Sequence, residues 1–405
     1  MPNNAEALLP DESNLALDVV ADDVVATDGK QAELFRIQAS QDWTAIRDDD
    51  LASGDTWVVV RDNHAYHTVH RFHPYFAMCP PPLARRAIEA YSKPGDLVAD
   101  PFCGAGVTMA EAMIAGRRSV GIDVLSMARF ISKVKTTLVD ISLDEAMALA
   151  DRAETLSKEE DLQVDLSSIY NVDYWFLPST QRQLAAMLAA ADAEPDPDKR
   201  DFYRLAVSCV VRSVSKAGNL ESHLHIKKGK KIPDGFRLFR LRLLDMVARE
   251  RAFARLVSRP VHSCAVHAGD SRDLTDILAD ESVDFVFTSP PYGTGTKYAS
   301  VYRLQMQLLG LDRIRGALET TKDFLGELGK CLDEINRVLK PGGRLALLYG
   351  TNRHFSSRDV AERAETAGLR LEETIGCPVI DESKMVRGDY KRSMANEHLI
   401  ILSKP

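Results

Sequence analysis

The order of apolar and polar positions in the first half of this chain predicts a strand, a helix and a second strand. Leu97–Asp100 is a short apolar run, the alanine- and methionine-rich stretch 108–115 has helical character, and Ser119–Asp123 is apolar again. This order predicts a βαβ unit of a parallel sheet. Further elements are predicted as strands at 56–60, 265–270, 283–289 and 344–349 and as a helix at 324–339.

The stretch between these two groups of strands has a different pattern. From Leu143 to about Val261 apolar residues recur at helical spacing, and no strand alternation is present. A polar, glycine-punctuated segment, 216–235, predicts a loop between helices. We therefore predict an α/β fold whose sheet is interrupted by a helical insertion. We expect three parts: an acidic, disordered tail over 1–40, a catalytic domain over 41–140 with 262–405, and the helical insertion over 141–261.

Composition narrows the class of protein. A chain of 405 residues with 45% hydrophobic residues can bury a sizeable core, which excludes disorder of the whole chain. No apolar run of membrane-spanning length and no early basic cluster are present, so we expect a soluble, cytoplasmic protein without a membrane partner. The six cysteines lie far apart, without the C-x-x-C spacing of a zinc site. A ladder of histidines at three-residue spacing, 64 to 73, lies in extended surroundings, so no metal is expected.

Charge is unevenly distributed around the formal net value of −8. Residues 1–30 hold seven acids against Lys30 alone, whereas 216–259 holds twelve basic residues against four acidic ones. This basic region is a candidate for contact with nucleic-acid phosphates. The alternative, a solvated surface loop, is the better interpretation of the lysine run taken alone. The candidate contacts are Lys227, Lys228, Lys230, Lys231, Arg237 and Arg240, and Asn219, His223 and His225 are candidates for reading base edges.

A Gly-x-Gly turn follows the strand that ends at Asp100. Gly104 and Gly106 lie between this strand and a predicted helix, which is the context that a nucleotide-binding turn requires. Asp123 ends the next predicted strand about twenty residues later, where a ribose-binding acid belongs. A tight packing turn is the alternative for the glycines alone. Together with Asp123 they predict a bound adenosyl cofactor.

A second motif, Ser289-Pro290-Pro291-Tyr292, follows the apolar run 283–287. The two prolines fix φ and bias the residues before them toward extended geometry, so nearby carbonyl groups point in set directions. Those carbonyls could accept hydrogen bonds from an exocyclic amine, and the Tyr292 ring could stack on a base. A proline-rich loop after a buried strand is the alternative.

The two motifs together resemble the S-adenosylmethionine-dependent amino-methyltransferases of DNA, which methylate cytosine at N4 or adenine at N6. The resemblance implies a Rossmann-like methyltransferase with a mostly parallel seven-stranded sheet and S-adenosylmethionine as cofactor. It extends to the segment 72–78, although Met78-Cys79 stands where Lys-Phe is common, to 266–271, and to a closing strand at 396–402. The cofactor-binding residues it implies are His73, Tyr75, Asp100, Phe102, Cys103, Gly104, Ala105, Gly106, Thr108, Asp123, Val124, Asp270 and Ser271.

The same resemblance assigns the catalytic role to Ser289, Pro290, Pro291 and Tyr292. It implies that Ser289 favours methylation at the exocyclic N4 amine of a flipped cytosine. Methylation at carbon 5 would need a Pro-Cys nucleophile, which the chain lacks. N6-adenine methylation of DNA, guanine-N2 methylation of RNA and a non-catalytic DNA-binding role are the alternatives. Double-stranded DNA is the implied partner, the helical insertion the implied target-recognition domain, and a cognate restriction endonuclease is left open.

Overall fold

The computed structural model describes residues 59–61, 68–76, 78–218, 224–292, 297–312, 318, 321–350, 354–377, 379–381 and 397–405. The acidic tail expected over 1–40 lies outside these residues. So do four side chains considered above, His64, His67, Asn219 and His223.

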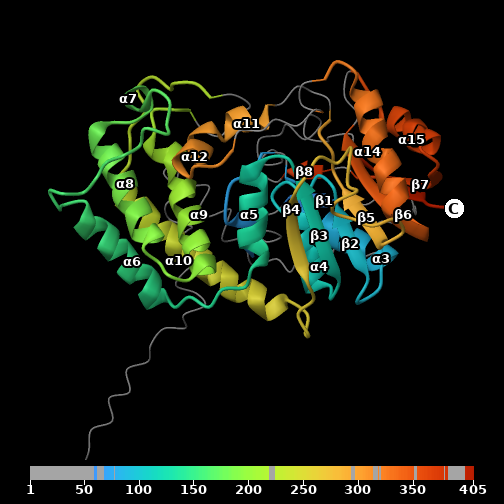
Figure 1. Cartoon of the computed structure of the whole chain (residues 1–405), viewed down its shortest axis with the longest axis horizontal. Coiled ribbons are helices and arrows are strands. Elements are labelled where there is room, and N and C mark those ends of the chain that lie inside the picture. The colour runs from blue at the N-terminus through green and yellow to red at the C-terminus, as the bar shows by residue number, and fades with distance from the viewer. Residues whose placement is uncertain are drawn as a thin grey trace, which may run out of the picture.

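A seven-stranded sheet forms the centre of the α/β part (Figure 1). Its strand order is β4-β3-β2-β5-β6-β9-β7, and all neighbouring strands are parallel except the two pairs that contain β9, which are antiparallel. The expected α/β, Rossmann-like, mostly parallel sheet is thereby confirmed. A separate parallel pair joins β1 and β8. The strands are β1 (Val59–Arg61), β2 (Leu97–Asp100), β3 (Arg118–Asp123), β4 (Cys264–Ala268), β5 (Val283–Thr288), β6 (Leu339–Gly350), β7 (Arg370–Gly376), β8 (Val379–Asp381) and β9 (Glu397–Ser403).

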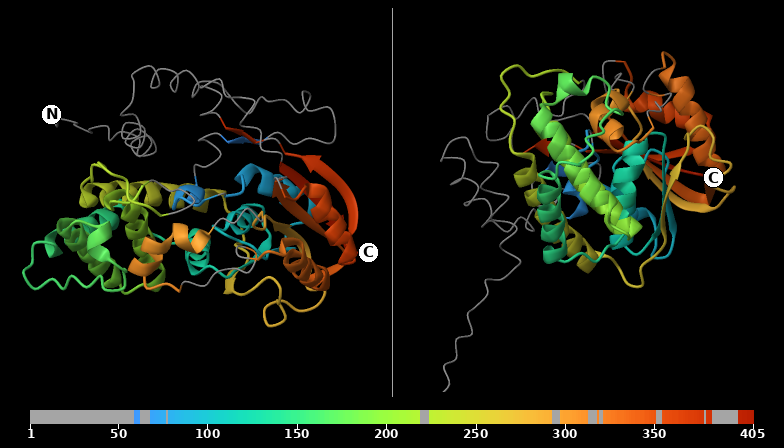
Figure 2. Two further views of the ribbon diagram at one scale, coloured as in Figure 1. Left: turned by 90° about the horizontal axis from the view of Figure 1, so that it is seen from above. Right: turned by 60° about the vertical axis from the view of Figure 1, so that its left-hand side comes forward.

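Alternation along the strands divides the sheet into two buried faces. Val98 and Phe285 pack into one cluster with residues of α3 (Pro81–Tyr91) and α4 (Val107–Ile114). Their neighbours Ala99 and Val286 pack on the opposite face with α14 (Phe324–Val338) and α15 (Ser357–Thr366). The helix α5 (Ser126–Thr136) lies against β3 and β4. The sheet is therefore the middle of three layers (Figures 1 and 2).

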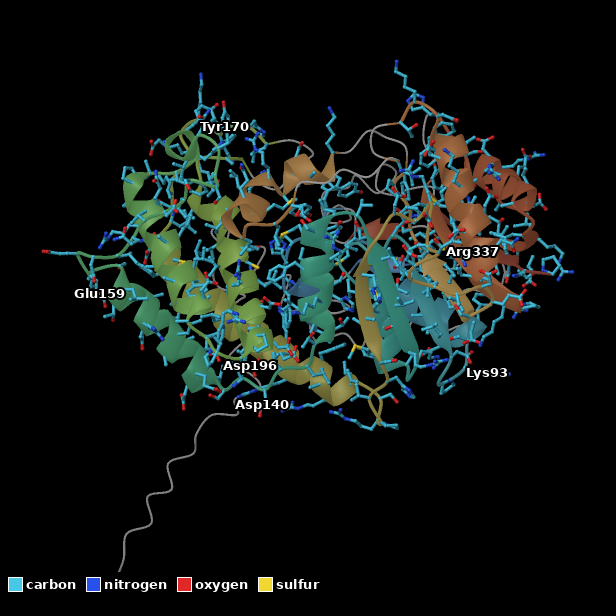
Figure 3. The ribbon with its side chains drawn as sticks, in the orientation of Figure 1. Lys93, Asp140, Glu159, Tyr170, Asp196 and Arg337 are labelled. Carbon is cyan, nitrogen blue, oxygen red and sulfur yellow. The ribbon has the colours of Figure 1, made fainter. Side chains whose placement is uncertain are left out.

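A helical region follows α5 along the chain and lies beside it in space (Figure 1). Side-chain caps define several of its helix starts: Ser142 and Glu145 form a capping box, and Asp196 and Asp234 each accept two backbone N–H bonds. Figure 3 places Glu159 and Tyr170 at the outer end of this region, and Lys93 and Arg337 at the opposite end of the molecule. The helices are α6 (Leu143–Leu156), α7 (Val172–Trp175), α8 (Pro178–Asp192), α9 (Pro197–Val214) and α10 (Gly235–Leu256).

One apolar core runs from α5 into the helical region. Val69 and Phe72, in and after the short helix η4 (Val69–Arg71), share this core with Ile131 of α5 and Phe202 of α9. Two short helices that follow β5, α11 (Tyr298–Val301) and α12 (Arg303–Leu308), belong to the same core, and α12 contacts α9. No helix in the described part of the chain is long and apolar enough to cross a membrane.

Candidate functional site

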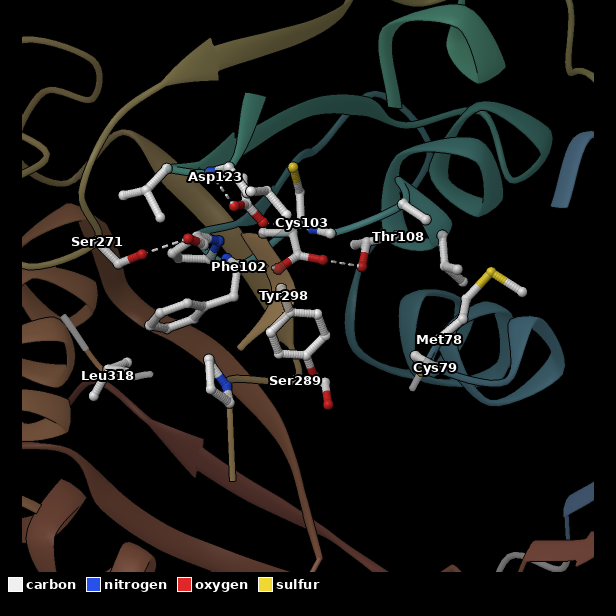
Figure 4. A pocket seen from close by; sticks show the side chains of 18 of the residues that line it. Met78, Cys79, Phe102, Cys103, Thr108, Asp123, Ser271, Ser289, Tyr298 and Leu318 are labelled. Atoms are coloured by element: carbon white, nitrogen blue, oxygen red, sulfur yellow. Dashed lines mark hydrogen bonds between the residues drawn. The ribbon is translucent and has the colours of Figure 1, made fainter. Parts of the chain in front are cut away.

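A cavity opens at the carboxyl ends of β2 and β5, which are neighbours in the sheet. The chain leaves β2 toward β3 on one side, whereas β5 lies on the other side, so this point is a topological switch. In open α/β sheets ligands bind in the crevice at such a point. The glycine turn after β2 and the proline loop after β5 both contribute to the cavity wall (Figure 4).

The glycine turn has a backbone conformation that a residue with a Cβ atom would rarely adopt. Gly104 and Gly106 have φ values of +49° and +76°. A Cβ atom on Gly106 would lie 2.8 Å from the Ser132 Oγ atom and 3.0 Å from the Ser132 Cα atom. Gly106 is also the residue before the first turn of α4, and its amide donates to the Cys103 carbonyl at 2.8 Å. The turn thus exposes backbone to the cavity at the start of a helix.

Asp123 ends β3 with its carboxylate held by two backbone amides. Gly104 N–H donates to Oδ2 at 3.0 Å and Leu125 N–H donates to Oδ1 at 2.8 Å. Burial raises the pKa of this carboxyl, and the two amides oppose the rise. Each oxygen keeps further acceptor capacity, because a carboxylate offers about four lone-pair sites. Asp123 lines the cavity and could accept bonds from a pair of hydroxyl groups.

Asp100 joins the ends of the two central strands. Thr288, the last residue of β5, donates to Oδ1 at 2.6 Å, Thr108 of α4 donates to Oδ2, and Phe102 N–H donates at 3.1 Å. Burial raises the pKa of Asp100 to about 6, although all three donors favour the charged form. Thr288 was missed as a site residue by the sequence reasoning. Its only signal there was its position directly before the proline motif.

The proline motif contributes two of its four residues to the cavity wall, Ser289 and Pro291. Pro290 and Tyr292 do not line it. The Tyr292 ring packs against Tyr349, with ring centroids 5.0 Å apart, and its hydroxyl lies 3.4 Å from Ser289 Oγ. The tyrosine that the sequence predicted as a stacking platform is therefore turned toward the core in this structure.

A different aromatic group faces the cavity. Tyr75 and Tyr298 both line it, and their rings are stacked with centroids 6.2 Å apart. Tyr75 also stacks with Tyr302, with ring centroids 5.3 Å apart. Tyr298 was not recognised from sequence because it lies beyond the motif, in a helix of four residues.

His73, expected to bind cofactor, lies away from the cavity. Its Nδ1 donates to the Pro74 carbonyl at 2.9 Å, and its Nε2 accepts from Ser208 of α9 at 2.8 Å. Burial lowers the pKa of His73 to about 3, so the ring is neutral. It ties the segment before α3 to the helical region. Within the described ranges no group of three or more potential ligands could hold a metal ion.

The loop after β4 supplies the far wall of the cavity. Ser271 donates to the Pro101 carbonyl, and Asp270 forms an ion pair with Arg272 at 2.7 Å that holds the pKa of its carboxyl below the ordinary range. Figure 4 shows Ser271 and Leu318 on the opposite side of the cavity from Met78 and Cys79. The remaining expected cofactor residues that line it are Phe102, Cys103, Ala105 and Val124.

The basic residues of the helical region differ in their surroundings. Lys227, Lys228 and Lys231 are exposed. Lys230 instead donates to the carbonyls of Arg212 and Ala217 at 2.7 and 2.8 Å, and burial lowers its pKa to about 8. Arg240 forms an ion pair with Asp151 at 2.6 Å, and Arg237 lies beside it in a groove between α6 and α10. A second groove, lined by Lys230, Lys231, His73 and Pro74, brings the loop next to the segment that enters the cavity.

Comparison with known proteins agrees with this geometry. The model of a family described as DNA methylase matches residues 26–130, which include the glycine turn and Asp123. Solved S-adenosylmethionine-dependent methyltransferases also align, among them one from Methanosarcina mazei with a TM-score of 0.35 at 11% identity over 78% of this chain and 96% of that one. A score this low adds no argument, so the fold rests on the sheet order.

Three curated relatives are methyltransferases by name, and one of them is named as a DNA adenine methyltransferase. Type II methyltransferase M.MvaI of Kocuria varians is 26% identical over 60% of this chain and 58% of the relative. Type II methyltransferase M.EcaI of Enterobacter cloacae is 30% identical over 31% of this chain and 27% of the relative. DNA adenine methyltransferase YhdJ of Escherichia coli is 47% identical over 12% of this chain and 16% of the relative. The chain thus spans little more than half the length of M.MvaI, and less of the others. With the glycine turn, Asp123 and the proline motif converging on one cavity, it is similar to the S-adenosylmethionine-dependent amino-methyltransferases.

Proposed function

We propose that this protein transfers a methyl group from S-adenosylmethionine to the exocyclic N4 amine of a flipped cytosine in DNA. One observation carries the proposal: Ser289 and Pro291 of the proline motif line the same cavity as the glycine turn and Asp123. A methyl donor and an amine acceptor would therefore meet within one enclosed space. Positioning of this kind supplies much of the rate in group transfer.

The residues present fit the cofactor. Gly104 lines the cavity and allows a ligand to approach the backbone, whereas Gly106 does not line it and makes room for Ser132 of α5. Asp123 presents acceptors suited to ribose hydroxyls. Asp100 offers negative charge near the centre of the cavity. S-adenosylmethionine, when bound, supplies an electrophilic methyl group on a sulfonium.

The proline motif would prepare the amine for attack. An exocyclic amine is a weak nucleophile because its lone pair is delocalised into the ring, and acceptors that bind its hydrogens localise that pair. Ser289 Oγ and the Pro290 carbonyl are such acceptors in the proposal. No covalent intermediate is involved. Cys103, one of two thiols in the cavity wall, is buried against Ser132, and burial raises its pKa well above the ordinary value, which does not suit a thiolate nucleophile.

Adenine N6 is the second candidate base. It is favoured by the similarity to the adenine methyltransferase YhdJ of Escherichia coli, 47% over 47 residues. Cytosine is favoured by Ser289. In the resembling family this motif can also begin with Asp or Asn, which are stronger acceptors, and Ser at this position accompanies mostly N4-cytosine methylation.

Double-stranded DNA is the proposed substrate, and extrusion of the target base costs a few kcal/mol (~2–4) that contacts in the cavity would offset. The basic loop with Lys227, Lys228 and Lys231 would supply phosphate contacts, and the helical region 141–261 would recognise the target.

Mass spectrometry of nucleosides tests the reaction. DNA incubated with the protein and labelled S-adenosylmethionine should contain labelled N4-methylcytosine after digestion. Ser289→Ala should lower turnover only in part, because the Pro290 carbonyl remains as an acceptor for the amine, and it should leave cofactor affinity unchanged. Labelled N6-methyladenine would show that adenine, not cytosine, is the target base. Label found only in RNA would refute DNA as the substrate.

A further inference from the structure

Lys135 of α5 is a buried ammonium group that no oxygen atom of the described residues contacts. Its side chain is 0% exposed, and its Nζ atom has one hydrogen-bonding contact there, the Met78 Sδ atom at 3.8 Å. No carboxylate in the described ranges lies within ion-pair distance of it. A thioether is a weak acceptor, and a charge buried without a partner is expensive. Burial accordingly lowers the pKa of Lys135 to about 7.

Lys135 lies directly behind one end of the cavity. Met78 lines the cavity, and its Sδ atom lies 3.8 Å from the Lys135 Nζ atom, so the ammonium group contacts a side chain of the cavity wall. Ser132, one helical turn before Lys135, donates to the Gly104 carbonyl at 2.7 Å, which places this face of α5 behind the glycine turn. Met78 lies across the cavity from Ser271 (Figure 4).

This end of the cavity is where the amino-acid part of S-adenosylmethionine would lie if Asp123 and Ser271 face the adenosine part. The amino-acid part carries a carboxylate, which needs a cation or several N–H donors when it leaves water. Among the cavity-lining side chains of the described residues only Arg272 is cationic. It already pairs with Asp270 and with Glu327, at 2.7 and 2.6 Å, on the adenosine side.

We propose that Lys135 is the counter-cation of the cofactor carboxylate, with the Met78 side chain as a movable cover over it. The proposal deepens the proposed function, because it takes the ligand to be S-adenosylmethionine. Methionine is unbranched and adapts to irregular spaces, so rotation of Met78 would open a path between Nζ and the cavity. The carboxylate then forms a charge-assisted hydrogen bond with Nζ, and any neutral fraction of Lys135 takes up a proton.

Two ligands separate this role from a general effect on the site. S-adenosylhomocysteine carries the carboxylate, whereas methylthioadenosine has the same adenosine and thioether without the amino-acid part. By calorimetry, Lys135→Met should weaken S-adenosylhomocysteine binding about tenfold or more and leave methylthioadenosine binding unchanged. Lys133→Met is the matched control: Lys133 is on the same helix, half exposed, and paired with Asp201 at 2.7 Å. It should change neither affinity.

Proton uptake gives a second readout. Near pH 8, where Lys135 with a pKa of about 7 is largely neutral, the wild type should take up a proton on binding S-adenosylhomocysteine, measured in buffers of different ionisation enthalpy. Lys135→Met should remove this uptake, while its unfolding free energy stays equal or rises because a buried charge is gone. Equal weakening for both ligands, no weakening, or uptake retained in Lys135→Met would overturn the proposal.

These measurements concern binding alone. A wild type that binds S-adenosylhomocysteine through Lys135 but methylates no DNA would overturn the proposed function and leave the role of Lys135 intact. A wild type that binds neither ligand would overturn both.

Discussion

Two buried acids at the sheet and one in the helical region have opposite kinds of partner. At the carboxyl ends of the strands, Asp100 and Asp123 are held by hydroxyl and amide donors, and no described cation lies within ion-pair distance of either. In the helical region Asp245 pairs with both Arg242 and Arg249, at 3.1 and 2.8 Å. Acids held by neutral donors keep their charge available to a ligand, whereas acids paired with arginine are already neutralised. For these three acids the difference separates a carboxylate that can bind a ligand from one that holds two parts of a helix together.

Two buried acids, one in each region, should make stability depend on pH in different ranges. Asp100 has a pKa of about 6 against an ordinary 3.8, and Glu250 of α10 has one of about 8 against 4.5. Both values are raised by burial, so the folded state binds more protons than the unfolded state, and stability falls as pH rises through each range. Asp100→Asn should abolish the fall between about pH 4 and 6, which is on the order of 3 kcal/mol. Glu250→Gln should abolish the fall that continues to about pH 8, which is on the order of 5 kcal/mol. Urea unfolding across pH measures this, and parallel curves for wild type and both variants would contradict it.

Asp123 should matter to the cofactor in a way that an acid of the helical region does not. Asp123→Asn removes one acceptor oxygen from the cavity, and the Kd for S-adenosylhomocysteine should rise about 100-fold by calorimetry. Asp151→Asn, which removes an exposed partner of Arg240, is the control and should leave the Kd unchanged. Unchanged affinity in Asp123→Asn would remove this residue from the site.

Two glycines in left-handed conformation offer a matched pair for stability. Gly106 (φ +76°) would bring a Cβ atom against Ser132, whereas Gly229 (φ +71°), in the basic loop, has nothing within 4 Å of that position. Both alanine variants bear the backbone strain, and only Gly106→Ala adds a clash. Its unfolding free energy should fall by about 1–2 kcal/mol more than that of Gly229→Ala. Equal losses of unfolding free energy in the two variants would mean that α5 moves at Ser132 and relieves the clash.

The smallest effect is expected for the exposed lysines. Replacing Lys227, Lys228 and Lys231 by Ala should weaken DNA binding about tenfold at moderate salt and reduce the slope of log K against log salt by about 1–3. The control replaces three exposed cations around the sheet, Lys93, Lys330 and Arg358. An unaltered slope in the loop variant would move the DNA surface elsewhere.

Sequence adjacency decided which features could be predicted. The glycine turn and Asp123 belong to one βαβ unit, so a short stretch of sequence contains their whole geometry. Thr288 bonds to Asp100 across 188 positions of sequence, and that contact depends on β5 lying beside β2, which no local pattern specifies. For the same reason the inward turn of Tyr292 against Tyr349 and the engagement of Lys230 by two backbone carbonyls were not foreseen.

If the helical region recognises the target, as proposed, the apolar core that it shares with α5 bears on how new specificities could evolve. A recognition module that is exchanged between enzymes must separate from its scaffold along a polar boundary. Here the boundary is closed by Phe72 against Phe202, edge to face at 5.5 Å, and by the His73–Ser208 hydrogen bond. Exchange of the helical region as a cassette would leave this seam mismatched. Diversification would instead proceed by single substitutions in exposed loops, which evolution can test one at a time.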